Sequence, residues 1–150
     1  ARRESSFNPQ AQSPVGARGL MQLMPGTGQH VSQQLGVAWQ GVASLEDPET
    51  NVMLGSAYIR DMAARYSGNR VAAAAAYNAG PGRVDRWLAN SDEPFDLFIE
   101  EIPFRETREY VQAVLTYRAI FEGLAKGTTQ GVHMMSEHER TIRYNSGLQR

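Results

Sequence analysis

One acidic residue near the start of the chain stands where general acid chemistry is feasible. Glu4 closes a short helical stretch and is followed by the small hydroxylated residues Ser5 and Ser6, which can hold a carboxyl group without neutralising it. Such a group, with an ordinary pKa of about 4.3, keeps its proton near neutral pH only when burial disfavours the charged form. Taken alone, a glutamate near a helix end is more often a solvated charge.

Other kinds of catalytic chemistry find little support in the sequence. The chain has no cysteine, and its histidines are isolated: His30 stands alone on a predicted helix, while His133 and His138 lie in a polar C-terminal segment. Nucleophilic triads and histidine metal clusters are therefore not expected. The glycine-rich stretches at 26–28 and 80–82 lack the lysine and the preceding strand of a phosphate-binding loop. We expect neither a cofactor nor a metal.

The composition fits a single domain with a core of its own. The chain has 150 residues, of which 41% are hydrophobic, and this is enough for one core but marginal for two. Its 15 Lys and Arg residues nearly balance 16 Asp and Glu residues, so no overall positive field attracts nucleic acid or anionic lipid. The longest apolar run, 71–77, is far shorter than the ~20 residues that span a bilayer. We expect a soluble chain that recognises any polymer locally.

The first residues have the pattern of the end of a longer helix. Residues 1–5 are typical of a last helical turn, which the following Phe7-Asn8-Pro9 breaks. No charged segment followed by an apolar one, the pattern of a secretory signal, is found there. We therefore expect the chain to be a fragment of a longer polypeptide.

Helix signals recur along the rest of the chain, whereas strand-like alternation of Val, Ile and Thr with polar residues is missing. Pro25 and Gly36 bracket one predicted helix, and residues 47–49 (DPE) start another that runs to about Tyr66. The remaining predicted helices are an alanine-rich one from 72 that stops at 77–82, and those over 83–88 and 106–124. The predicted fold is all-α.

The spacing of apolar residues also predicts which helix faces are buried. In the helix that ends near Tyr66, the predicted face holds Val52, Met53, Ala57, Tyr58, Ile59, Met62 and Ala63. In the helix over 106–124, it holds Tyr110, Val114, Tyr117, Phe121 and Leu124. Trp87 is expected to point inward from the helix over 83–88.

Four patterns in fixed order resemble the lysozyme-like catalytic domain of lytic transglycosylases. Residues 4–9 (ESSFNP) resemble the catalytic Glu-Ser motif of that family, and residues 13–25 (SPVGARGLMQLMP) resemble its second motif. Residues 76–80 (AYNAG) resemble the third motif, and residues 100–111 (EEIPFRETREYV) resemble the last. Any one of these short motifs is unspecific, but their common order makes the resemblance specific.

The resemblance implies an all-α, goose-lysozyme-type fold with a substrate groove. It assigns residues 1–127 to the catalytic domain, with a truncated first helix, and residues 128–150 to a C-terminal tail that docks on this domain. Residues 135–144 are similar to the C-terminal end of large soluble family members, which carry a helical region before the catalytic domain. The implied partners are peptidoglycan glycan strands and a missing helical region of the same polypeptide. The implied location is the periplasm or cell envelope.

The resemblance further implies cleavage of the β-1,4 bond between N-acetylmuramic acid and N-acetylglucosamine. Glu4 is then the only catalytic carboxyl: it protonates the leaving oxygen, and afterwards it accepts the proton of the C6 hydroxyl of the muramic residue, which leaves a 1,6-anhydro end. The implied substrate-binding residues are Ser13, Gln22, Met24, Tyr77, Glu100 and Tyr110. Those expected to support the site structurally are Ser5, Gly19, Asn78 and Gly80, with Asn78 fixing the turn before Gly80.

Two other functions remain open. A goose-type lysozyme shares the fold and the single acid but delivers water in place of the C6 hydroxyl. A catalytically silent wall-binding module would keep the groove, although it has no need of Glu4. Some site residues also have simpler alternatives: Gln22 as a helix-capping amide, Tyr77 as a core tyrosine and Tyr110 as ordinary packing.

Overall fold

Regular secondary structure consists only of helices in residues 1–128 and 130–149, which this computed structural model describes. Nine α-helices and one 3-10 helix follow each other along these residues, where β-type pairing is limited to isolated bridges. The prediction of an all-α fold is therefore confirmed. The chain divides into two units, residues 1–60 and 61–150, and the boundary lies within α4 (Pro48–Arg65). No helix in the described ranges combines the length and the apolar character that crossing a membrane requires.

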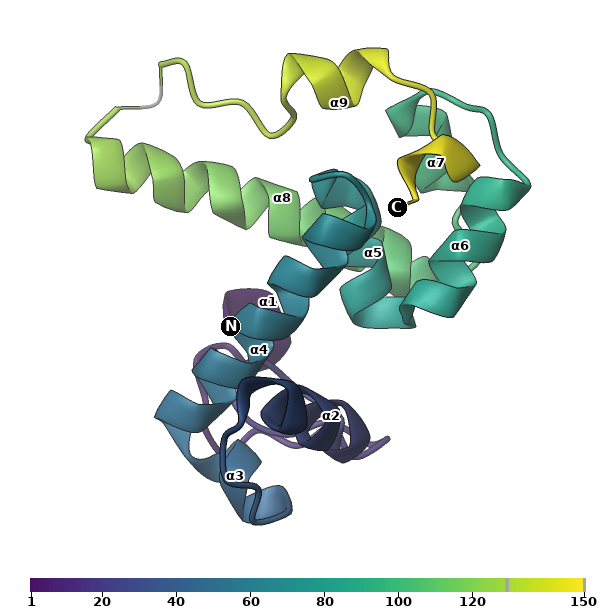
Figure 1. Ribbon diagram of the computed structural model, residues 1–150. Helices are drawn as coiled ribbons and strands as arrows, with labels where there is room; N and C mark the ends of the chain where they lie inside the picture. The colour runs from purple at the N-terminus through teal and green to yellow at the C-terminus, as the bar shows by residue number, and fades with distance from the viewer. Residues whose placement is uncertain (129, 150) are drawn as a thin grey trace. The chain divides into compact units, whose positions relative to one another are not determined.

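The first unit holds three helices and the beginning of α4 (Figure 1). α1 (Arg2–Ser5) is followed by a long loop over residues 6–24, and then by α2 (Pro25–Leu35) and α3 (Val42–Glu46). As predicted, α2 begins at Pro25 and ends at Gly36, whose φ of 67° is left-handed. α4 begins after Asp47, whose carboxylate accepts a hydrogen bond of 2.9 Å from the backbone N–H of Thr50.

The core of the first unit comes from the loop and from the helices that follow it. Its most deeply buried apolar side chains are Leu23, Val31, Leu45 and Leu54. The predicted buried face of α4 is only partly right, because Val52 and Met53 are exposed whereas Leu54, outside that face, is fully buried. One helix carries several overlapping apolar stripes, and the neighbouring elements select the stripe that is buried.

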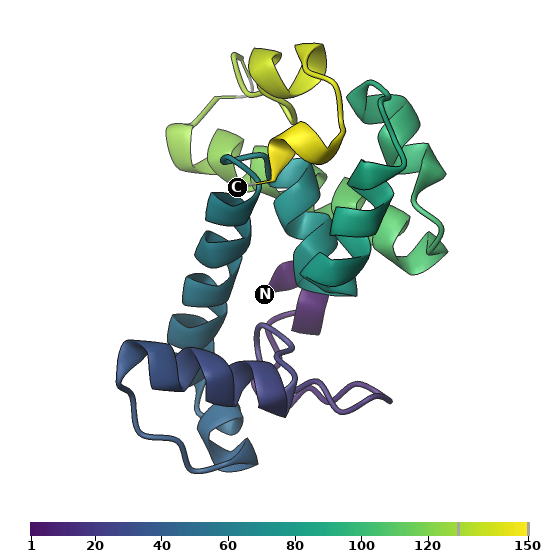
Figure 2. The same ribbon diagram turned by 45° about the vertical axis from the view of Figure 1, so that its right-hand side comes forward.

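In the second unit, α5 (Arg70–Ala79) lies at the centre of a group of helices (Figure 2). It packs against α6 (Pro81–Ala89) and α8 (Arg105–Lys126), and α7 (Phe95–Glu101) also packs against α8. The alanines at 72–76 are all buried, and their small side chains let the neighbouring helices approach closely. α6 buries Val84 and Leu88, whereas Trp87 is half-buried, so the inward orientation predicted for Trp87 is only partly right.

The apolar stripe predicted along α8 is wrong over the second half of this helix. In the predicted stripe, Tyr110 is buried and Val114 and Tyr117 are half-buried, but Phe121 and Leu124 are exposed, the latter to 72%. Val111 and Leu115, outside the predicted stripe, are buried as well. Only the N-terminal half of α8 lies against α5, and the C-terminal half extends past it (Figure 1). The same apolar stripe is therefore packed against other helices in one half of α8 and exposed in the other, and the spacing of its residues alone does not predict this difference.

The segment after α8 packs on the second unit through a few buried side chains. α9 (Glu137–Thr141) starts with a capping box: the Ser136 hydroxyl accepts from the Glu139 N–H at 3.1 Å, and the Glu139 carboxylate accepts from the Ser136 N–H at 2.8 Å. Tyr144 is fully buried and stacks on Phe98 of α7, with ring centroids 5.2 Å apart. A 3-10 helix, η1 (Ser146–Leu148), packs against α6. Of the tail predicted over 128–150, Thr129 and Arg150 lie outside the described residues.

Glu139 ties this tail to α5 by a buried ion pair. Its carboxylate accepts from the Arg70 backbone N–H at 3.0 Å and from Arg70 Nε at 2.9 Å, and it also pairs with Arg70 Nη2. Burial by itself raises the pKa of Glu139, but hydrogen bonds from Arg70 and Ser136 outweigh burial and lower this pKa to about 2. We expect Glu139→Gln to lower the free energy of unfolding at pH 7 by about 3 kcal/mol. The exposed neighbour Glu137 provides a matched control, and Glu137→Gln should change the free energy by less than about 0.5 kcal/mol.

The stabilisation by Glu139 should also depend on pH. It is fully present above the unfolded-state pKa of about 4.3, and it is lost as the pH falls toward the folded-state value of about 2. Denaturant titrations from pH 7 to pH 2 should therefore show the unfolding free energies of the wild type and of Glu139→Gln converging on acidification. A difference that does not change with pH would contradict this role.

Candidate active site

Glu4 lies on α1, which is attached to the loop that precedes α2. The residue is half-buried, and its carboxylate oxygen Oε1 is shielded from solvent. The hydroxyl of Ser5 donates a hydrogen bond of 2.8 Å to the backbone carbonyl of Leu20. Ser6 and Phe7 then take positive φ values of 51° and 65°, which end the helix after a single turn. The position of Glu4 therefore depends on how the loop around Leu20 is held.

Asn51 of α4 holds this loop. Its fully buried side chain donates from Nδ2 to the carbonyls of Arg18 at 3.0 Å and Leu45 at 2.8 Å. Its Oδ1 accepts from the backbone N–H of Met21 at 2.8 Å. Sequence reasoning missed Asn51, although one signal was available: asparagine is disfavoured inside a helix unless its side chain bonds elsewhere.

Gly19 lies where this loop passes closest to Asn51. Its φ of +78° is left-handed, and a Cβ atom at this position would overlap the side-chain amide of Asn51 and the carbonyl oxygen of Leu45. Glycine is the one residue that meets both conditions without a shift of the neighbouring atoms. The structural role expected of Gly19 thus has a steric reason.

Gln22 combines a strained backbone with a fixed side chain. Its φ of 48° is uncommon for a residue with a side chain. The amide nitrogen Nε2 donates to the carbonyls of Ala11 at 2.9 Å and Gly19 at 3.0 Å, so both amide protons are used within the loop. Any bond from Gln22 to a sugar hydroxyl would therefore be accepted by the amide oxygen. Backbone strain of this kind is often found at functional sites.

The other two candidates in the first unit lie at the two ends of the second motif. The Ser13 hydroxyl accepts a hydrogen bond of 2.9 Å from the Ala17 N–H, which leaves its own proton to donate. Met24 precedes α2 as its N-cap residue and is exposed. The structure thus connects Glu4 and Ser5, through Leu20, with the loop that carries Gly19 and Gln22.

The remaining candidates lie in the second unit, on α5, α7 and α8. Tyr77 is half-buried in the last turn of α5. Asn78 Oδ1 accepts a hydrogen bond of 2.8 Å from the buried hydroxyl of Thr107, so its side chain links α5 to α8. Gly80 ends α5 with a φ of 90°, a conformation that favours glycine.

Glu100 and Tyr110 differ in exposure. Glu100 is exposed near the end of α7, and its Oε1 accepts a long hydrogen bond of 3.4 Å from Gln112 of α8. Tyr110 is buried on α8, as its alternative role in packing requires. Two groups of candidates therefore exist: one around Glu4 in residues 1–60, and one on α5, α7 and α8 in residues 61–149.

Comparison with families of known proteins gives two matches. The family model described as Transglycosylase SLT domain matches residues 1–96, which include Glu4, the loop and α5. The model described as Soluble lytic transglycosylase helical domain matches residues 101–130. The Soluble lytic murein transglycosylase of Salmonella typhimurium is 45% identical over 147 residues, which are 96% of this chain and 22% of that protein.

Two solved structures resemble the fold. The 70 kDa soluble lytic transglycosylase of Escherichia coli has a TM-score of 0.87 at 42% identity, over 95% of this chain and 23% of its own. An inactive mutant of the lytic transglycosylase Slt of Pseudomonas aeruginosa, in which a glutamate is replaced by glutamine, has a TM-score of 0.84 at 45% identity, over 96% of this chain and 23% of its own. The predicted lysozyme-like fold is confirmed, and the chain spans about a fifth of the length of these relatives.

Proposed function

Since the chain belongs to the soluble lytic transglycosylase family, we propose that it cleaves the β-1,4 bond between N-acetylmuramic acid and N-acetylglucosamine in peptidoglycan. The single observation that carries the proposal is the family match over residues 1–96, which contain the carboxyl group and the loop attached to it. The product is a glycan strand that ends in 1,6-anhydromuramic acid. The periplasm or the cell envelope is the proposed location, because murein is the substrate named for the relatives.

Glu4 is the proposed acid and base of this reaction. Its protonated carboxyl gives a proton to the bridging oxygen as the bond from that oxygen to C1 of the muramic residue breaks. The acetamido oxygen of the same sugar shelters the positive charge at C1. The Glu4 carboxylate then takes the proton of the C6 hydroxyl while O6 bonds to C1. No water is consumed, and Glu4 is protonated again at the end.

Two observations support this role of Glu4. Its Oε1 is shielded from solvent, and burial of a carboxyl favours the form that carries a proton. In addition, replacement of one glutamate by glutamine is enough to give the inactive Pseudomonas aeruginosa relative. Both fit a mechanism with a single catalytic carboxyl.

The proposed substrate contacts follow from the matched motifs. Gln22 accepts from a sugar hydroxyl through its amide oxygen, Ser13 donates from its hydroxyl, and Met24 offers an exposed apolar surface. Tyr77, Glu100 and Tyr110 are proposed to bind the glycan from α5, α7 and α8. Ser5, Gly19, Asn78 and Gly80 are proposed to act through the structure around them.

Analysis of the products tests this function against that of a goose-type lysozyme. Purified peptidoglycan is digested with the chain, and the new ends are identified by mass spectrometry. We expect muramic acid ends in the 1,6-anhydro form, lighter by one water than reducing ends. Reducing ends as the main product would instead establish hydrolysis, and the absence of cleavage would favour a silent wall-binding module.

A further inference from the structure

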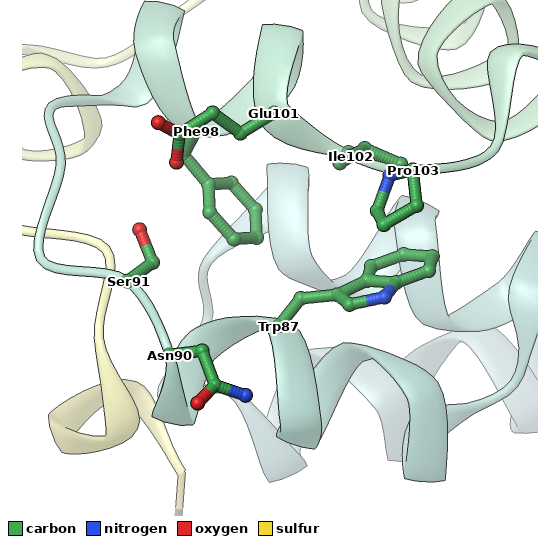
Figure 3. A pocket seen from close by; sticks show the side chains of 7 residues that line it. All are labelled: Trp87, Asn90, Ser91, Phe98, Glu101, Ile102 and Pro103. Atoms are coloured by element: carbon green, nitrogen blue, oxygen red, sulfur yellow. The ribbon is translucent and has the colours of Figure 1, made fainter.

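A pocket in the second unit is formed by residues outside the predicted active site (Figure 3). It has a volume of about 270 Å³. Its apolar lining comes from Trp87 on α6 and from Phe98, Ile102 and Pro103 in and after α7. Its polar lining consists of Asn90, Ser91 and Glu101. None of these residues has a part in the proposed cleavage reaction.

One end of the pocket is apolar, and the polar groups of Glu101 and Ser91 lie at the other end, with Phe98 and Asn90 between the two ends. In Figure 3, the indole of Trp87 faces Pro103 at one end, and the carboxylate of Glu101 and the hydroxyl of Ser91 lie at the other. Phe98 and Ile102 are buried and form the floor, whereas Asn90, Glu101 and Pro103 are exposed and form the rim. A ligand of this pocket must therefore be apolar on one side and rich in hydrogen-bonding groups on the other.

The aromatic end is held in place by its neighbours. Trp87 contacts Phe104 edge to face, with ring centroids 5.6 Å apart and an angle of 88° between the rings. The guanidinium of Arg83 lies over the same Phe104 ring, 5.3 Å from its centroid. Trp87 is nevertheless only half-buried. A fixed, partly exposed indole offers a flat apolar surface at little cost in conformational entropy.

The polar groups that line the pocket have donor and acceptor atoms that no protein group uses. Asn90 uses Nδ2 to donate to the Arg86 carbonyl at 2.8 Å, which leaves its Oδ1 as an acceptor. Ser91 Oγ accepts from the Glu93 N–H at 3.3 Å, which leaves its proton to donate. Within residues 1–128 and 130–149, the side chain of Glu101 makes no ion pair and no hydrogen bond, so its exposed carboxylate is open to donors of a ligand. Together, these three side chains offer a ligand more hydrogen-bond acceptors than donors.

We propose that this pocket binds one N-acetylated hexosamine ring, as an accessory glycan site apart from the residues that cleave. The acetamido methyl and the ring C–H groups lie against Trp87, and hydroxyl groups donate to Glu101 and to Asn90 Oδ1. The volume is below the range of about 300–1,000 Å³ that is typical of drug-sized ligands, and so it suits a single ring. The choice of this sugar rests on the proposed function, whose substrate consists of such rings.

A ligand with an ammonium group and an aliphatic chain is the alternative, because an aromatic ring beside a carboxylate also suits a cation. The neutral groups of Asn90 and Ser91 favour the sugar, since an ammonium ion has no acceptor for the Ser91 proton. The two ligands respond differently to Glu101→Gln. A sugar keeps a neutral acceptor and loses little affinity, whereas an ammonium ligand loses its counter-charge.

Titration by two-dimensional amide NMR tests the proposal, with N-acetylglucosamine and lysine amide as the probes. We expect N-acetylglucosamine to shift the indole N–H of Trp87 and the amides of residues 87–103. Trp87→Ala should weaken this binding at least about tenfold, Trp87→Phe should retain part of it, and Glu101→Gln should change it less than threefold, by about the value of one altered hydrogen bond. Leu97→Ala, at an exposed position of α7 outside the pocket, is the matched control and should bind as the wild type does.

Several outcomes would overturn the proposal. One is the absence of shifts at residues 87–103 with the sugar, and another is unchanged binding by both Trp87 variants. Shifts with lysine amide that Glu101→Gln abolishes would assign the pocket to an ammonium ligand instead. Because the monosaccharide has no bond to cleave, the titration is independent of the proposed function. If the sugar does not bind in the pocket, glycan cleavage can still occur, and if cleavage is absent, the titration still shows whether the pocket binds the sugar.

Discussion

Replacement of Glu4 by glutamine should abolish glycan cleavage and leave the fold intact. Glutamine has nearly the same shape as glutamic acid, but its amide can neither give up a proton to the bridging oxygen nor accept one from the C6 hydroxyl. General acid and base catalysis each contribute about 10²–10⁴-fold, so we expect the rate to fall by at least about 10³-fold. The rate is measured as release of soluble fragments from purified peptidoglycan.

The matched control is Glu49→Gln, at an exposed position in the first turn of α4 in the same unit. This variant should cleave at the rate of the wild type. Both variants should unfold at nearly the wild-type temperature, because neither side chain is in the core of the first unit. Undiminished turnover by Glu4→Gln would remove Glu4 from the mechanism.

The second large effect is expected at Asn51, on stability and on activity together. Asn51→Leu keeps the size of the side chain but leaves the Met21 N–H and the carbonyls of Arg18 and Leu45 without their partner. An unsatisfied buried polar group costs about 1–3 kcal/mol, so the free energy of unfolding should fall by about 3 kcal/mol or more. Cleavage should fall as well, even at temperatures where the variant is folded, because this loop carries Gln22.

Denaturant unfolding and peptidoglycan digestion measure the two effects of Asn51→Leu. Asn8→Ala serves as the control, because Asn8 is exposed and its Oδ1 accepts one local hydrogen bond, of 3.0 Å, from the Gln10 N–H. It should lose less than about 1 kcal/mol. A free energy of unfolding of Asn51→Leu within about 0.5 kcal/mol of the wild type would show that Asn51 does not anchor the loop.

Local signals predicted the ends of the longer helices well because they act over a few residues, whereas α3, α7 and α9 were not predicted. Pro25 and Gly36 mark the ends of α2, and Asp47 marks the start of α4 through its bond to Thr50. Gly127 ends α8 with a left-handed φ of 64°. The buried faces of α4 and α8 were predicted less well, since the burial of an apolar stripe depends on elements that are distant in sequence.

In the candidate site, too, local features were predicted better than contacts between residues that are distant in sequence. The catalytic motif and the importance of Gly19 and Gly80 were predicted from the sequence, and both glycines have a left-handed φ, a conformation that favours glycine. The anchor at Asn51 was missed: an asparagine inside a predicted helix signals that its side chain bonds elsewhere, but its partners, up to 33 positions away, could not be predicted from the sequence. The pocket beside Trp87 was missed for a related reason: its lining joins α6 to α7, and only their packing creates it.

In the proposed mechanism, Glu4 activates the C6 hydroxyl of the substrate, and not a water molecule, to bond to C1. Cleavage of peptidoglycan in water enriched in ¹⁸O tests it most directly, with the mass of each new muramic acid end as the readout. The account predicts ends in the 1,6-anhydro form without ¹⁸O, and no such ends from Glu4→Gln. New reducing ends that carry ¹⁸O would contradict it, because their oxygen would have come from solvent.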